Sequence, residues 1–204
     1  MIKNKRVLIT GNTSGLGLAL TDLLLSGGNK VYSLSKRFIK KKKNLMSQVC
    51  NLTNLDNIDK ALNRLLKTKK LDYVFLNAGI LGKIDLTKNI KLQEINEIFK
   101  INVFSNKQII DYLIKKKIKI KLIIGISSGA ALFPKYGWYL YCSSKSALKY
   151  MFEAYALENP KIKFINLSPG LMKTKMQKQI YNVNEKKIPS VKKFKNDLEA
   201  RPLT

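Results

Sequence analysis

Tyr141 and Lys145 are the residues of this sequence whose types and spacing most directly suggest acid–base chemistry. The chain has no histidine, so Ser-His-Asp catalysis and most zinc sites are excluded, and another side chain must carry any proton. Helical residues four apart share a face, so both side chains can reach one substrate. A free phenol titrates at about pH 10 and a nearby ammonium stabilises phenolate, so we expect Lys145 to lower the pKa of Tyr141. The pair therefore predicts a proton donor or acceptor.

Ser128 is a candidate third member of this group. It ends an apolar run and lies thirteen residues before Tyr141. A serine hydroxyl can hydrogen-bond a carbonyl or alkoxide oxygen while the phenol transfers the proton. Ser127 is the competing residue, and both serines would also suit a plain turn at a strand end. A Tyr-x-x-x-Lys pair is common on helix surfaces, so whether this pair is catalytic depends on the elements that position it.

Apolar runs bounded by turn residues alternate along the chain with longer segments of helical spacing. Strands separated by helices of this length form a parallel sheet covered on both faces, which predicts an α/β fold: a single-domain, three-layer α/β/α, Rossmann-like doubly wound sheet. We expect residues 1–170 to form the nucleotide-binding domain with the catalytic residues. Residues 171–204 lose this rhythm and are expected to form a lid-like or partly mobile extension. The expected strands are Arg6–Thr10, Lys30–Ser35, Gln48–Asn51, Leu71–Asn77, Lys121–Ser127 and Lys161–Ser168, and the expected helices are Leu16–Ser26, Leu55–Lys67, Leu92–Lys116 and Tyr139–Leu157.

A glycine-rich turn joins the first expected strand to the first expected helix. Gly11 permits the tight turn, Gly15 lets the backbone approach a phosphate, and Gly17 allows close helix packing, while the helix N-terminus offers N–H donors and a positive dipole. Such a turn can also be a plain connector, but the strand before it and the helix after it indicate a pyrophosphate site. The predicted cofactor residues of this turn are Gly11, Asn12, Thr13, Ser14, Gly15, Leu16 and Gly17.

Ser35, Lys36 and Arg37 stand at the end of the second expected strand, near the place of an adenosine ribose. An acidic residue there would bind the free 2′-hydroxyl of NAD and repel a 2′-phosphate, whereas a hydroxyl followed by two cations attracts that phosphate. The sequence therefore favours NADP(H), with NAD(H) as the less favoured cofactor. The alternative interpretation is that Lys36 and Arg37 are ordinary solvent-exposed residues of a loop in a lysine-rich chain.

The spacing Gly-x-x-x-Gly-x-Gly, followed by the serine, tyrosine and lysine in this order, resembles the short-chain dehydrogenase/reductase family. The resemblance runs from residue 10 to about residue 174 and implies that Ser128, Tyr141 and Lys145 are catalytic, Lys145 also holding the nicotinamide ribose. It implies further that Asn102 organises a water leading protons towards the lysine, with Asn106 as the competing residue. Thr174 would equally suit a helix N-cap. The remaining cofactor positions implied are Asn51 and Leu52 at the adenine end, Asn77, Ala78 and Gly79 beside the central sheet, Pro169, Gly170 and Thr174 at the nicotinamide end, and Tyr141 and Lys145 themselves.

Together these residues predict an NADP(H)-dependent oxidoreductase that transfers hydride between nicotinamide and a carbonyl or secondary alcohol, with Tyr141 as general acid/base. The alternative is a non-catalytic NADP(H)-binding sensor or interaction protein on the same fold. Ordinary family members continue into a further helix and strand, whereas this chain stops at Thr204, as a short variant or a truncated sequence. The sequence does not identify the substrate. An apolar wall of the substrate site is suggested by Phe133, Tyr136, Trp138 and Met172, but these residues suit ordinary packing or a dimer face equally well.

The formal net charge of +26 could indicate nucleic acid or an anionic membrane as a partner. Only four of the 39 basic residues are arginine, although arginine is the residue that makes bidentate contacts with bases and phosphates. Translation of an A+T-rich genome would by itself produce a lysine-rich composition. We therefore expect no nucleic-acid partner, no metal and no membrane span, since no segment approaches about 20 apolar residues. The start of the chain lacks a secretory signal, so we expect a cytoplasmic protein. The expected partners are a small-molecule carbonyl or alcohol substrate and further copies of the chain, in a homo-oligomer with a dimer favoured.

Overall fold

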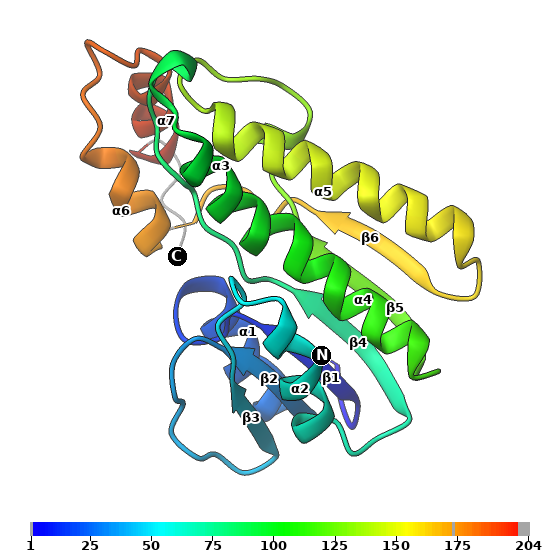
Figure 1. Cartoon of the computed structure of the whole chain (residues 1–204). Helices are drawn as coiled ribbons and strands as arrows, with labels where there is room; N and C mark the ends of the chain where they lie inside the picture. The colour runs from blue at the N-terminus through cyan, green and yellow to red at the C-terminus, as the bar shows by residue number, and fades with distance from the viewer. Residues whose placement is uncertain (1, 173, 200–204) are drawn as a thin grey trace.

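A six-stranded parallel sheet with helices on both faces forms the centre of the protein, as the computed structural model shows (Figure 1). The structure describes residues 2–172 and 174–199, so positions 173 and 200–204 of the expected C-terminal extension lie outside the described residues. The strands are β1 (Arg6–Thr10), β2 (Lys30–Ser35), β3 (Leu45–Val49), β4 (Lys70–Leu76), β5 (Lys119–Ile126) and β6 (Lys163–Leu167). The α-helices are α1 (Gly15–Ser26), α2 (Asp56–Leu65), α3 (Leu92–Phe99), α4 (Ser105–Lys115), α5 (Tyr139–Glu158), α6 (Lys175–Tyr181) and α7 (Ser190–Glu199), and the short helical turns are η1 (Thr87–Asn89), η2 (Lys100–Phe104) and η3 (Gly129–Ala131).

The strand order is β3-β2-β1-β4-β5-β6, with every neighbouring pair parallel. The chain runs outward from β1 to β3, then returns to the other side of β1 and continues through β4 to β6. This reversal between β1 and β4 opens a crevice at the carboxyl ends of the strands, where ligands of doubly wound sheets bind. The predicted Rossmann-like fold is confirmed.

Two layers of apolar side chains hold the helices against the sheet. On one face, Leu62 of α2, Ile109 of α4 and Phe152 of α5 pack together over the strands. On the other face, Leu24 of α1 packs against Val7 and neighbouring strand residues. Because both faces are covered, the central strand β1 is buried along almost its whole length, as is usual for parallel sheets. Within residues 2–172 and 174–199, no helix has the length and apolar character needed to cross a membrane.

Most expected elements agree with the structure to within one or two residues at each end, and two differ more. Strand β3 begins and ends earlier than the predicted Gln48–Asn51, because its pairing with β2 starts at Val31 opposite Leu45 and ends at Ser35 opposite Val49. The expected helix Leu92–Lys116 is interrupted by the π-helical turn η2, which separates α3 from α4. Periodicity did not indicate this turn, whose residue Asn102 is held by hydrogen bonds to Ile80 and Ser144 from distant segments.

Two helices follow β6 in the segment where the sequence predicted no regular elements. Ile180 of α6, Ile188, and Val191 of α7 are buried and form a third apolar cluster with Trp138, the residue just before α5. Val191 and Phe194 are three residues apart on one face of α7, and Ile188 lies just before the helix in the same cluster. The segment thus contains more apolar packing than its lysine-rich composition suggested.

Candidate active site

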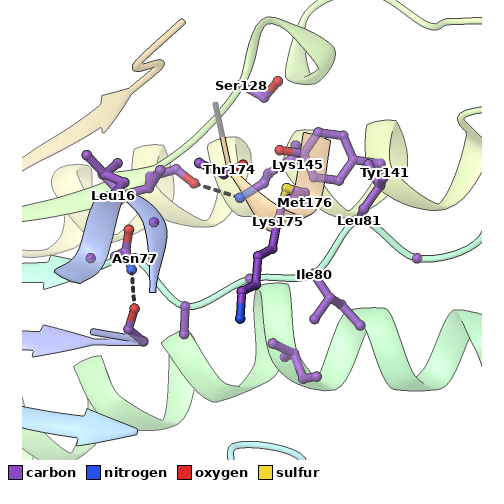
Figure 2. Close-up of a pocket in the computed structure, with 18 of the residues that line it drawn as sticks. Leu16, Asn77, Ile80, Leu81, Ser128, Tyr141, Lys145, Thr174, Lys175 and Met176 are labelled. Atoms are coloured by element: carbon purple, nitrogen blue, oxygen red, sulfur yellow. Dashed lines mark hydrogen bonds between the residues drawn. The ribbon is translucent and has the colours of Figure 1, made fainter. Parts of the chain in front are cut away.

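A pocket of about 1100 Å³ lies at the carboxyl ends of the strands, at the crevice between β1 and β4. Leu16 and Asn77 lie on one side of it, and Ser128, Tyr141 and Lys145 lie on another (Figure 2). Helix α6 lines a further side. The glycine turn and the tyrosine–lysine pair, which are more than a hundred residues apart in the chain, therefore face one cavity.

The glycine turn places the start of α1 at the pocket. A side chain at Gly17 is excluded, because its Cβ would lie 2.2 Å from the carbonyl oxygen of Gly11 and 2.4 Å from Asn77 Nδ2. This close packing joins α1 to β1 and to the end of β4. The first backbone bond of the helix runs from Leu18 N to Ser14 O, so earlier N–H groups of the first turn have no partner within the helix.

Asn77 and Thr10 hold the ends of the two central strands together. Asn77 Nδ2 donates to the carbonyl oxygens of Thr10 and Gly11, both at 2.9 Å. Thr10 Oγ1 accepts from the backbone N–H groups of Asn77 and Ala78, both at 3.0 Å. These bonds satisfy polar groups at the crevice, and they fix the floor of the pocket beside the glycine turn.

The second strand ends in a basic rim. Ser35 is buried, and its hydroxyl donates to the carbonyl oxygen of Arg37 at 2.8 Å. This bond between residues two apart stabilises a turn of the chain. Lys36 and Arg37 are exposed and line the pocket. Asn51 also lines it, and its Oδ1 accepts from the N–H of Thr53 at 3.2 Å. The adenine end of a dinucleotide would meet cations here.

Asn102 is fully buried in the π-helical turn behind the pocket. Its Oδ1 accepts from Ile80 N, and its Nδ2 donates to Ile80 O, both at 2.9 Å, and to Ser144 Oγ at 3.0 Å. The side chain therefore fastens the segment after β4 to α5. Among the described residues, the Asn106 side chain makes one hydrogen bond, from its Nδ2 to the Asn102 carbonyl at 2.8 Å.

Lys145 is buried beneath Tyr141 at the pocket wall. Its Nζ lies 5.6 Å from the centre of the Tyr141 ring and donates to the carbonyl oxygen of Ile126 at 2.6 Å, a bond drawn in Figure 2. Burial lowers the pKa of Lys145 to about 8, because desolvation penalises the ammonium. Ser128 lies at the turn after β5, where its Oγ accepts from Ala130 N at 3.2 Å.

The expected lowering of the Tyr141 pKa by Lys145 is wrong for this structure. Burial raises the pKa of Tyr141, with Ser128 as an opposing hydrogen-bond partner and Cys142 as a further raising influence. The physical reason is that desolvation of the phenolate is the dominant cause, and Lys145, whose Nζ lies 5.6 Å from the ring centre, does not offset it. Tyr141 is thus held as a neutral phenol, which is the form that donates a proton.

The pocket brings together nearly all of the residues that the sequence predicted for the cofactor. Thr174 caps α6 by accepting from Gln177 N at 3.4 Å, and its Cγ2 lies 3.3 Å from the position that a Cβ on Gly15 would occupy. Asn12 is the exception: it is absent from the lining, and its buried amide has no hydrogen-bond partner within the described part of the chain. The predicted residues in the lining are Gly11, Thr13, Ser14, Gly15, Leu16, Gly17, Ser35, Lys36, Arg37, Asn51, Leu52, Asn77, Ala78, Gly79, Tyr141, Lys145, Pro169, Gly170 and Thr174.

The apolar wall suggested by the sequence is divided between two places. Trp138 and Met172 line the main pocket, whereas Phe133 and Tyr136 are exposed and line a separate hollow of about 630 Å³. Several further lining residues were not named individually from the sequence, and many of them lie in the tail or after β4. Their helical spacing could have indicated the tail members, but not that they reach the pocket. These residues include Leu81, Met176, Gln177, Ile180 and Phe194.

These features fit a dinucleotide. The pocket offers free backbone N–H groups at a helix N-terminus for a pyrophosphate, glycines that leave the backbone open, and cations at the adenosine end. At its other end stand a neutral phenol and a buried lysine. No cluster of three or more metal-binding side chains occurs among the residues that the structure describes.

Comparisons with known proteins agree with this arrangement. A profile described as short chain dehydrogenase matches residues 5–185. Benzil reductase ((S)-benzoin forming) of Bacillus subtilis is 28% identical over 202 residues, which cover 92% of this chain and 83% of that protein. A solved short-chain dehydrogenase/reductase from Saccharomyces cerevisiae is 25% identical, with a TM-score of 0.87 over 98% of this chain and 85% of its own. ElxO with NADP bound is 27% identical, with a TM-score of 0.78 over 87% of this chain and 78% of its own.

Proposed function

Because this chain belongs to the short-chain dehydrogenase family, we propose that it is an NADP(H)-dependent oxidoreductase acting on a carbonyl or secondary alcohol. The observation that carries this proposal is that Tyr141, Lys145 and Ser128 line the same pocket as the glycine turn. A hydride donor held along the glycine turn and a proton donor at the far wall would then meet at one carbonyl group.

Each of these three residues has a distinct task in the proposal. Tyr141 donates the proton to the carbonyl oxygen during reduction, and because burial raises its pKa the phenol is protonated at neutral pH. Ser128 hydrogen-bonds the same oxygen. Lys145 holds the nicotinamide ribose and, being buried, is fixed in position by the Ile126 carbonyl. The nicotinamide, when bound, supplies or accepts the hydride.

Asn102 is proposed to organise the water that leads protons towards Lys145. Its side chain is held by hydrogen bonds to Ile80 and Ser144, which anchor this part of the π-helical turn to the segment after β4 and to α5. The cofactor contacts predicted from the sequence are proposed unchanged except for Asn12, whose side chain is absent from the pocket lining.

NADP(H) is the proposed cofactor, since Lys36 and Arg37 offer two cations at the adenosine end. The solved ElxO structure holds NADP, which is a property of that protein and a supporting parallel. A cytoplasmic location and a homodimer stay predictions from the sequence.

Turnover of NADPH with a panel of aldehydes, ketones and diketones tests the proposal. The relative named benzil reductase makes an aromatic diketone a reasonable member of the panel. We expect NADPH oxidation with at least one compound, and we expect Tyr141→Phe to abolish it while leaving NADPH affinity nearly unchanged. NADPH binding without oxidation of any compound would favour the sensor alternative, and undiminished turnover by Tyr141→Phe would refute the role of Tyr141.

A further inference from the structure

The last helix of the chain reaches back to the segment that precedes Tyr141. Helix α7 begins at Ser190, and the residues around its start contact the turn Tyr136–Trp138. Ile188 packs against Gly137, whose φ of +79° and lack of a side chain permit the approach, since a Cβ there would lie 2.8 Å from Ile188. Figure 1 shows α7 beside the start of α5, although the two are about fifty residues apart in the chain.

Ser190 makes two hydrogen bonds to this turn. Its Oγ accepts from the indole N–H of Trp138 at 3.0 Å and donates to the carbonyl oxygen of Tyr136 at 2.6 Å. One hydroxyl thus satisfies a buried indole and a backbone carbonyl two residues apart. An ion pair reinforces the attachment, because Lys187 contacts Asp85 at 2.8 Å and the N–H of Asp85 donates to Gly137 O at 3.0 Å.

Trp138 transmits this attachment to the site. Its ring is buried and meets the Tyr141 ring edge to face, at 6.3 Å between centroids and 64° between planes. On another side it packs against Phe194 of α7, at 5.5 Å between centroids. The indole therefore fills the space between the last helix and the phenol ring, and its orientation is set by the bond to Ser190.

We propose that Ser190 is a positioning residue of the active site, which fixes Trp138 against the Tyr141 ring and so makes the C-terminal helix part of the proton-transfer apparatus. The inference rests on the proposed function of Tyr141. Positional errors of an ångström at a reacting group can cost up to about a hundredfold in rate, so an indole free to rotate beside the phenol would slow turnover.

Ser190→Ala removes both hydrogen bonds, and Ser190→Thr keeps the hydroxyl. Trp138 is the only tryptophan in the sequence, so its fluorescence reports this contact directly. We expect Ser190→Ala to shift the emission to longer wavelength and lower kcat roughly tenfold, with the KM for NADPH nearly unchanged. Ser190→Thr should restore both signals. Ser26→Ala is the control, because its hydroxyl bonds only Leu23 O, at an exposed helix end among the described residues.

A second measurement does not depend on turnover. The titration of Tyr141, taken as the difference in ultraviolet absorbance between each Ser190 form and the same form carrying Tyr141→Phe, reports the surroundings of the phenol. The groups facing it are Lys145, Cys142 and Ser128, with Lys135 above the Trp138 ring. We expect Ser190→Ala to lower the Tyr141 pKa towards its ordinary value, because a loosened indole admits water.

The outcomes separate the two proposals. If wild-type protein oxidises no NADPH, the proposed function fails, and the emission and titration still decide whether Ser190 positions Trp138 and Tyr141. Emission that Ser190→Ala leaves unchanged would overturn the inference. A shifted emission with both the Tyr141 titration and kcat at wild-type values would also overturn it, because the contact of Ser190 with Trp138 would then have no effect on the phenol.

Discussion

The ammonium nitrogen of Lys145 lies 5.6 Å from the centre of the Tyr141 ring, and both side chains come from one face of α5. The lysine is almost entirely buried and is held by the Ile126 carbonyl of the neighbouring strand. Burial acts on the two groups in opposite directions, lowering the pKa of Lys145 and raising that of Tyr141. Both shifts favour the neutral forms, and they have consequences for stability as well as for chemistry.

Lys145→Met should stabilise the protein at pH 7, with a gain that disappears at high pH. The pKa of Lys145 is about 8 in the folded protein and 10.5 ordinarily, so between these values the unfolded chain binds a proton that the folded chain lacks. Stability of the wild type therefore rises with pH across this window, and the ammonium costs up to about 3 kcal/mol below it. Urea unfolding of both proteins at pH 7 and pH 10 measures the difference.

Lys149→Met is the matched control for that experiment, because Lys149 lies one turn further along α5 and is partly exposed. Its contact with Glu153 at 2.6 Å raises its pKa, so its removal should give no gain at pH 7. A Lys145→Met protein no more stable than wild type at pH 7 would show that the buried ammonium is not destabilising.

Replacing Lys36 and Arg37 by alanine should weaken NADPH binding and leave NADH binding nearly unchanged. A charge-assisted bond to the 2′-phosphate contributes about 1.5 kcal/mol at an exposed site, so we expect roughly a tenfold loss of affinity for each cation. The effect should shrink as salt is added. Fluorescence titration with both cofactors measures it. Lys41→Ala, on an exposed residue of the same loop, serves as the control, and an equal loss for both cofactors would contradict a 2′-phosphate site.

Asn102→Ala should destabilise the fold more than Asn106→Ala. Without Asn102, the backbone N–H and carbonyl of Ile80 lose their partner in a partly buried place, which we expect to cost roughly 2 to 4 kcal/mol. Removing Asn106 loses one bond, to the Asn102 carbonyl, and about 1 kcal/mol. Thermal and urea unfolding compare the two. The reverse order would assign the structural role to Asn106.

The sequence predicted most of the elements because β-strands and helices bury their apolar side chains at different periods. The bounds of β1 and β2 are as predicted, and α5 differs by one residue at its end. Strand β3 was misplaced because its position depends on pairing with β2, which is a long-range contact. The π-helical turn at Asn102 was likewise not visible, since it is stabilised by contacts with Ile80 and Ser144 from distant segments.

By itself, the sequence determined which residues could do chemistry, the order in which they occur, and the parallel α/β fold that carries them, because residue type, spacing and periodicity are local properties of the chain. Only the tertiary structure decided that Asn12 is buried and absent from the pocket lining, that burial raises the pKa of Tyr141, and that α7 reaches Trp138 through Ser190. Desolvation and contacts between distant segments depend on how the whole chain packs, and no short stretch of sequence records them.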